Sequence, residues 1–132
     1  MTTKSNHRPH KTALFVCFGG MSNVGVLTGL AGLEVMRQVG RENACIFCLG
    51  GLPTRAESVL EKTAGARRIV TVDGCHMNCA RQIVEQAGFS PRHSLTLADD
   101  CGIAKKSSLD YTEADLHTAV QAILQIIQTD VV

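Results

Sequence analysis

The chain is poor in aromatic residues, with no tryptophan, one tyrosine and four phenylalanines among 132 residues. Proteins that bind single-stranded nucleic acid stack the bases on aromatic side chains, so this composition argues against such a surface. Neither sign of charge dominates, because 13 lysines and arginines face 12 aspartates and glutamates, which gives a formal net charge of +1. The chain therefore offers no electrostatic reason to expect nucleic acid or an acidic membrane as a partner.

Long apolar runs are also missing. No run approaches the ~20 residues that a membrane-spanning helix needs, and residues 1–11 are polar, without the apolar core of a secretion signal. We expect residues 1–11 to be a mobile tail, residues 12–132 to form a single domain, and the protein to be cytoplasmic. In such a reducing compartment, six cysteines indicate metal or redox chemistry more often than disulfide bonds. The sequence does not indicate an oligomeric state.

Apolar segments alternate with segments of helical periodicity along the whole domain. The apolar runs predict strands over residues 12–17, 43–49, 68–73 and 93–98. The periodic segments predict a helix capped by Ser22 or Asn23 and ending near Gly40, and a second helix with Pro53 in its first turn and its end at Gly65. A third helix ends at Gly88, and a fourth begins near Thr112, where Asp115 completes an approximate capping box.

This alternation is typical of an α/β fold. It predicts right-handed crossovers and a three-layer α/β/α sandwich around a four-stranded parallel sheet, with strand order 2-1-3-4 as in Rossmann-like and flavodoxin-like proteins. Ligands of such sheets bind outside the carboxyl ends of the strands.

Cysteines lie at or just beyond the carboxyl ends of the predicted strands. Cys17, Cys48 and Cys75 each come after an apolar run, and Cys79 lies one helical turn beyond Cys75. Cys75 and Cys79 are spaced i and i+4, which places both on one face if the segment is helical. Tetrahedral zinc needs thiolates about 3.8 Å apart, a separation that adjacent strand ends can provide. We therefore predict a metal site, most simply for zinc, made by Cys17, Cys48, Cys75 and Cys79; the alternative for each is packing as a small apolar residue.

The two remaining cysteines fit this site less well. Cys45 and Cys48 form a Cys-x-x-Cys, but residues three apart in a strand point to opposite faces, which makes Cys45 a core residue. Cys101 follows the fourth strand and is either a replaceable ligand or a bystander; the second interpretation is simpler. His76, between Cys75 and Cys79, is an alternative ligand or, more simply, an exposed side chain.

Acidic and glycine-rich segments share this edge. Asp73, Asp99 and Asp100 can serve as acceptors for metal ligands or as general bases, although such residues more often cap a turn. The glycine-rich turn that begins at Cys17 can hold an anion on backbone N–H groups, or its glycines can simply make room for a metal-bound sulfur. It has no Lys-Ser/Thr pair and so is not a P-loop. Arginines at 55, 67, 68 and 81 show no clustering that would define a phosphate site, and we expect them on a solvated face.

At these residues the chain resembles a known family. The segments Cys17-x-Gly-Gly-x-Ser-Asn-Val-Gly, Cys48-Leu-Gly-Gly-Leu and Asp73-Gly-Cys-x-x-x-Cys-Ala80 are similar to those of the DGC-domain family, named for its Asp-Gly-Cys motif. The similarity spans roughly residues 12–110, including Asp100-Cys-Gly-Ile-Ala-Lys. The family is described by four shared cysteines associated with zinc, and the resemblance assigns these to Cys17, Cys48, Cys75 and Cys79. It implies a metal and a fold but no reaction.

Three functional hypotheses follow. A closed four-cysteine zinc site favours a structural, sensing or carrier role over hydrolysis. The same thiols also suit an iron–sulfur cluster or a reversible disulfide in a redox or electron-transfer protein. The third hypothesis is an enzyme with Cys17 as nucleophile acting on a small anionic substrate, for which the sequence offers no obvious partner base.

Overall fold

A computed structural model describes residues 10–129 of the chain. The strands form one parallel sheet with the order β2-β1-β3-β4, which confirms the predicted topology. The strands are β1 (Thr12–Val16), β2 (Ala44–Ile46), β3 (Arg68–Asp73) and β4 (His93–Thr96). The helices are α1 (Asn23–Val39), the 3-10 turn η2 (Leu49–Gly51), α2 (Glu57–Gly65), α3 (Cys79–Gln86), α4 (Leu97–Asp100) and α5 (Glu113–Thr129).

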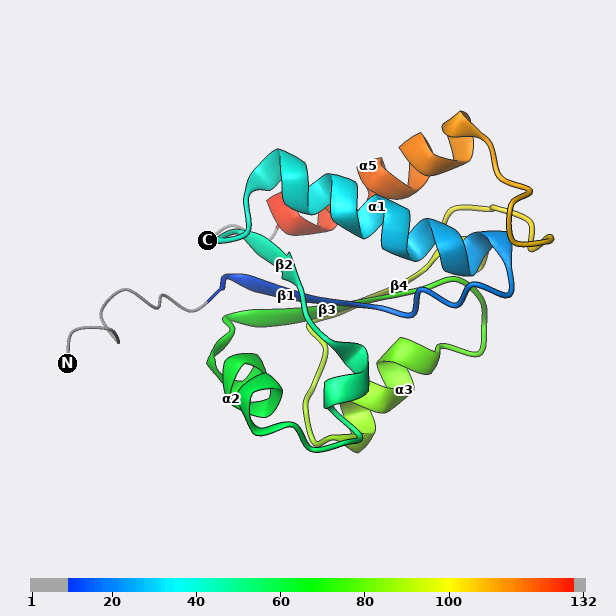
Figure 1. The fold of residues 1–132 in the computed structure, drawn as a ribbon. Helices are drawn as coiled ribbons and strands as arrows, with labels where there is room; N and C mark the ends of the chain where they lie inside the picture. The colour runs from blue at the N-terminus through cyan, green and yellow to red at the C-terminus, as the bar shows by residue number, and fades with distance from the viewer. Residues whose placement is uncertain (1–9, 130–132) are drawn as a thin grey trace.

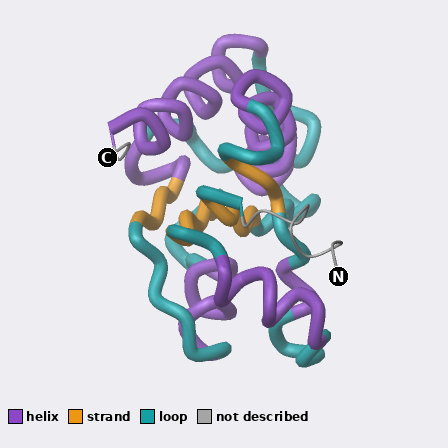
Figure 2. Tube along the Cα trace, turned by 90° about the vertical axis from the view of Figure 1, so that its left-hand side faces the viewer, coloured by secondary structure: helices purple, strands orange, loops and turns teal. Residues whose placement is uncertain are grey.

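Helices cover both faces of the sheet, as the α/β sandwich prediction requires. In Figure 1, α1 and α5 lie on one side of the strands, and α2 and α3 lie on the other; Figure 2 shows the same three layers after a turn of 90°. The side chains of each strand alternate between two cores. Leu14 and Val16 of β1 join the core under α1 and α5, whereas Ala13 and Phe15 join the core on the α2 and α3 face.

The ends of the long helices agree with their sequence signals. Ser22 caps α1, with its Oγ accepting the Gly25 N–H at 3.1 Å. At α5, Thr112 and Asp115 form a reciprocal capping box, since the Thr112 N–H donates to the Asp115 carboxylate and the Asp115 N–H donates to the Thr112 hydroxyl. Aspartate therefore serves here in the place where glutamate is more usual.

On the carboxyl side of the strands, three predicted boundaries are wrong by two residues or more. The second strand ends at Ile46 rather than at residue 49, because the chain turns into η2. The helix predicted to include Pro53 begins at Glu57, because turns with Arg55 at φ 60° intervene. The fourth strand ends at Thr96, where the Asp100 carboxylate accepts the Thr96 N–H at 2.7 Å and stabilises the short helix α4.

Arg68 also departs from expectation, because it does not belong to a solvated face. Its Nε donates to Thr12 Oγ1 of β1 at 2.6 Å, and its Nη2 donates to the carbonyl oxygen of Ile127 in α5 at 2.9 Å. The side chain thus ties the amino end of the sheet to the last helix.

Residues 1–9 of the predicted tail lie outside the described residues. His10 packs its ring edge-on against Phe47, with centroids 5.4 Å apart, and its Nδ1 lies 2.6 Å from the carbonyl oxygen of Arg41. Among residues 10–129, no helix combines the length and the apolar character that crossing a membrane would require.

Candidate metal site at the carboxyl edge of the sheet

The four predicted ligands lie on three segments at the carboxyl edge of the sheet. Cys17 directly follows β1, Cys48 lies two residues after β2, Cys75 lies two residues after β3, and Cys79 is the first residue of α3. All are free thiols. Cys17 and Cys75 are partly buried, whereas Cys48 and Cys79 are exposed.

The segment after Cys17 packs by close backbone approach. A Cβ on Gly25 would lie 1.9 Å from the carbonyl oxygen of Gly19, and one on Gly19 would lie 3.9 Å from Cys17 Sγ. Four backbone N–H groups from this turn and the start of α1 already donate within the protein, those of Phe18, Ser22, Asn23 and Gly25. Gly25 therefore serves close packing, and these four N–H groups already have acceptors within the protein.

Glycine also joins the β3–α3 segment to α1. A Cβ on Gly74 would lie 2.7 Å from both the backbone nitrogen of Gly25 and the carbonyl carbon of Val24. In addition, the Cys17 N–H donates to the carbonyl oxygen of Val72 at 3.0 Å. These contacts hold the segments that carry Cys17 and Cys75 side by side.

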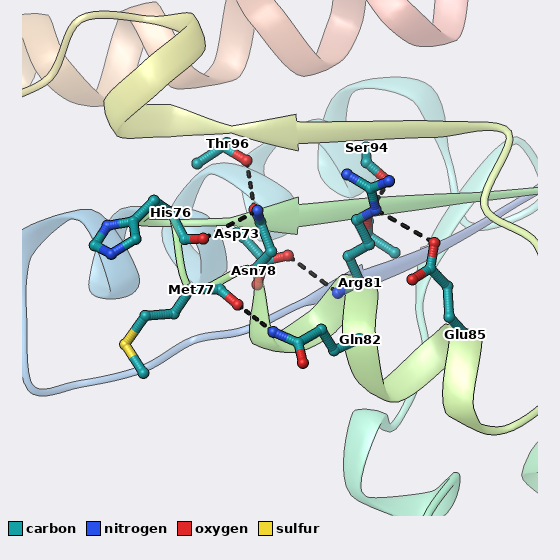
Figure 3. A network of polar contacts seen from close by, with 10 residues as sticks. Asp73, His76, Met77, Asn78, Arg81, Gln82, Glu85, Ser94 and Thr96 are labelled. Carbon is teal, nitrogen blue, oxygen red and sulfur yellow. Dashed lines mark hydrogen bonds and ion pairs between the residues drawn. The ribbon is translucent and has the colours of Figure 1, made fainter.

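Asp73 fixes the far end of the β3–α3 segment. Its two carboxylate oxygens accept the backbone N–H groups of Ala80 and Arg81 at 2.7 and 3.0 Å, so the last residue of β3 caps α3 (Figure 3). Burial raises the pKa of Asp73, partly offset by these two hydrogen bonds, which favour the ionised form. Of the roles considered for Asp73, the structure shows helix capping. Cys75 lies in the segment between Asp73 and the helix it caps, and Cys79 is the first residue of that helix.

Cys75 and Cys79 do not share a helical turn, which corrects the argument from their i, i+4 spacing. The Asn78 N–H donates to the carbonyl oxygen of Cys75 at 3.1 Å, and Asn78 adopts the left-handed conformation with φ 50°. Thr96 Oγ1 donates to the Asn78 side-chain oxygen at 2.6 Å, which secures this conformation from β4. Cys75 therefore lies in a turn and Cys79 starts the helix.

Two polar side chains accompany the partly buried thiols. Lys105 Nζ lies 3.8 Å from Cys75 Sγ, within donating distance of the sulfur. Cys17 Sγ lies 3.6 Å from Thr28 Oγ1 of α1, and that hydroxyl donates to the carbonyl oxygen of Gly25. Sequence reasoning missed both residues, because the contacts join positions 30 and 11 residues apart.

Sequence reasoning also missed the role of Asn23, which it considered only as an alternative to Ser22 for capping α1. It is 1% exposed, and its amide nitrogen donates to the carbonyl oxygens of Ala104 and Asp110 while its Oδ1 accepts the Lys106 N–H at 2.6 Å. This asparagine holds the segment that carries Lys105. A signal existed, since Asn23 belongs to the Ser-Asn-Val-Gly motif.

The strand register explains how the cysteines are spaced along the edge. Leu14 is opposite Ile46 and Val16 is opposite Val72, so the same register places Cys48 opposite Val16 and Cys17 opposite Asp73. Cys75 lies a further two residues beyond Asp73, so Cys48 and Cys75 stand at different positions along the edge. Accordingly, among the residues that the structure describes, no three His, Cys, Asp or Glu side chains converge as a metal-binding group.

The other predicted residues fall as follows. Cys45 is 5% exposed and packs in the core of the α2 and α3 face, which confirms its interpretation as a core residue. Cys101 is partly buried, and burial, with a smaller contribution from the charge of Asp100, raises its pKa. His76 is exposed, and its imidazole points away from the hydrogen-bonded network of Figure 3. Asp100 caps α4, and Asp99 is exposed.

Comparison with known proteins gives one match. A search of curated proteins and a search of solved structures each found no match to this chain. The family model of the DGC domain matches residues 13–123, a range that includes all four predicted ligands as well as Asn23 and Lys105. The chain belongs to the DGC domain family.

Proposed function

We propose that the protein binds zinc through Cys17, Cys48, Cys75 and Cys79, in a reducing cytoplasm, with a structural, sensing or carrier role. The observation that carries the proposal is the collection of four free thiols at one edge of the sheet. In parallel α/β folds, ligands bind at this edge. Thiolates are ligands that zinc prefers, so the chemistry of the donors fits the metal.

Metal binding by this set requires movement, because the thiols do not converge. The partly buried Cys17 and Cys75 lie on segments held together by glycine packing, and they would supply the fixed half of the site. The exposed Cys48 and Cys79 can reorient at lower cost because fewer neighbours surround them. Zinc would then link the β1, β2 and β3 segments, and its binding energy would contribute to folding.

The expected charge supports this arrangement. Four thiolates around Zn²⁺ carry a net charge of −2, and a nearby cation reduces the cost of gathering them. Lys105, 3.8 Å from Cys75 Sγ, is placed to provide that charge.

A closed four-thiolate site leaves no open position for a water molecule, which favours a non-hydrolytic role. The contact of Cys17 with Thr28 also argues against Cys17 as an activated nucleophile. A threonine hydroxyl is too weak a base to deprotonate a thiol, and activation normally needs a histidine, a cationic neighbour or a metal.

The direct test is the metal content and visible absorption of protein purified anaerobically without added metal. We expect about one colourless zinc per chain, retained through gel filtration. The double substitution C75S/C79S should abolish it. The matched control is C45A, which removes a thiol from the core and should keep the zinc if the protein remains folded.

Two outcomes would contradict the proposal. Zinc content near zero in the wild type, or zinc content equal in wild type and C75S/C79S, would show that these thiols do not hold the metal. A visible chromophore with iron and sulfide would instead support the cluster hypothesis.

A further inference from the structure

A groove lies at the opposite edge of the sheet, where the strands begin. It occupies about 520 Å³ between the end of α2 and the segment leading into β4, within the size range of small-molecule sites. In Figure 1 this is the end where α2 leads into β3, away from the start of α1. None of the cysteines lines it.

Two arginines that directly precede neighbouring strands meet at this groove. β3 and β4 pair with Val70 opposite His93, so Arg92 lies opposite Ile69, and the Arg92 N–H donates to the Ile69 carbonyl at 2.7 Å. Alternation along a strand puts Arg67 on the same face as Ile69, which belongs to the core under α2 and α3. Both arginines are exposed and line the groove.

The third arginine at this edge has a different role. Arg68 alternates to the other face, where its guanidinium binds Thr12 and Ile127. The charge of Arg68 adds positive potential to this edge of the sheet, whereas its hydrogen bonds stabilise the fold.

The other residues that line the groove are mostly apolar, so they suit the apolar part of a ligand rather than a second charged group. Ile69 belongs to the core of that face, and Phe89 and Ala66 pack against it. Ser90 adds an exposed hydroxyl beside them. Within residues 10–129, the side chains lining the groove include no carboxylate.

We propose that this groove binds a small organic phosphate, with the phosphate against Arg67 and Arg92 and the apolar part of the ligand over Ile69 and Phe89. Guanidinium groups match phosphate oxygens with paired N–H donors, which a lysine ammonium cannot do. The site is independent of the cysteines and of the zinc proposal. In the sequence, Arg67 directly precedes β3 and Arg92 directly precedes β4. Because these two strands are neighbours in the sheet, the two arginines come together at one place.

The test is calorimetric titration with phenyl phosphate, with inorganic phosphate and phenol as partial ligands. We expect phenyl phosphate to bind, and R67Q and R92Q each to weaken its binding by about tenfold, as loss of a charge-assisted hydrogen bond does. R37Q removes the same charge from the exposed face of α1 and should leave binding unchanged. Backbone amide NMR shifts caused by phenyl phosphate should centre on residues 66–69 and 89–92.

The proposal fails if phenyl phosphate does not bind. It also fails if inorganic phosphate binds as tightly as phenyl phosphate, because the apolar lining then contributes nothing. Equal affinity in R67Q, R92Q and R37Q would place the anion elsewhere. R67Q alters an exposed side chain outside any strand, so it decides the matter even if R92Q is destabilised.

Discussion

The two edges of the sheet are built differently, although the same four strands define both. At the carboxyl edge, the segments after β1 and β3 approach α1 so closely that Gly25 and Gly74 leave no room for a Cβ. At the amino edge, the chain is joined by a side chain, Arg68, and an open groove remains. The comparison teaches that Cys17 and Cys75 lie on tightly packed backbone, whereas Arg67 lies on an exposed surface that tolerates change.

The largest effect should come from adding one methyl group at the carboxyl edge. In G25A the new Cβ meets the Gly19 carbonyl oxygen, a backbone atom that cannot move without shifting the Cys17 segment. We expect the free energy of unfolding to fall by about 3 kcal/mol or more, measured by chemical denaturation. The control G50A has open space around its Cβ. Similar stabilities of the two variants would contradict the close packing described for this edge.

Asn23 tests whether the carboxyl edge also depends on buried polar contacts. N23A removes three hydrogen bonds to the segment 104–110 and should cost about 2–3 kcal/mol, since each is worth roughly 1 kcal/mol. N43A, which loses one hydrogen bond to Val39, should cost about 1 kcal/mol. Thermal unfolding measures both, and an N23A variant no less stable than N43A would remove Asn23 as the anchor of this segment.

At the amino edge, we expect substitution of Arg68 to lower stability much more than substitution of its neighbour Arg67. R68A loses the hydrogen bonds to Thr12 and Ile127, and we expect a cost of about 1.5–3 kcal/mol. R67A alters an exposed side chain and should change stability by less than about 0.5 kcal/mol. If denaturation shows the reverse order, the fold depends on the groove arginine and the division between the two is wrong.

The smallest effect concerns Cys101, the thiol left outside the proposed site. Because burial and Asp100 raise its pKa, less of it is thiolate at mildly alkaline pH, and thiolate is the form that alkylates. In metal-free protein we expect Cys101 to react more slowly than the exposed Cys48, and its rate to rise at higher pH. Mass spectrometry after timed alkylation measures both rates.

Asp100 supplies the control for that prediction. D100N removes the charge while keeping an oxygen acceptor for the Thr96 N–H, and it should speed alkylation of Cys101 modestly, whereas D99N should not. Equal rates for Cys101 in D100N and D99N would show that Asp100 does not act on this thiol.

The fold could be predicted because its signals are local and repeated. Alternating apolar and periodic segments define the strands and helices, and Ser22 and Thr112 mark two helix starts. The order 2-1-3-4 is the one common in flavodoxin-like parallel sheets, and the structure has it. The missed boundaries depend on turns that side chains from other residues stabilise, such as Asp100 accepting the Thr96 N–H. A propensity pattern does not encode such turns.

The candidate site was predictable only in outline. That Cys17, Cys48 and Cys75 would share an edge follows from the positions of the strands, and Cys45 was correctly assigned to the core from strand alternation. The stagger between Cys48 and Cys75 depends on the register between strands, and the separation of Cys75 from Cys79 depends on the left-handed Asn78. Lys105 and Asn23 meet the site only through the tertiary fold.

The central claim is that the four thiols at the carboxyl edge hold one zinc ion, and X-ray absorption at the zinc edge of the loaded protein tests it most directly. The account predicts four sulfur neighbours at about 2.3 Å, with one sulfur lost in C48S and the shell unchanged in folded C45A. A first shell dominated by nitrogen or oxygen at about 2.0–2.1 Å, or one unchanged by C48S, would contradict it.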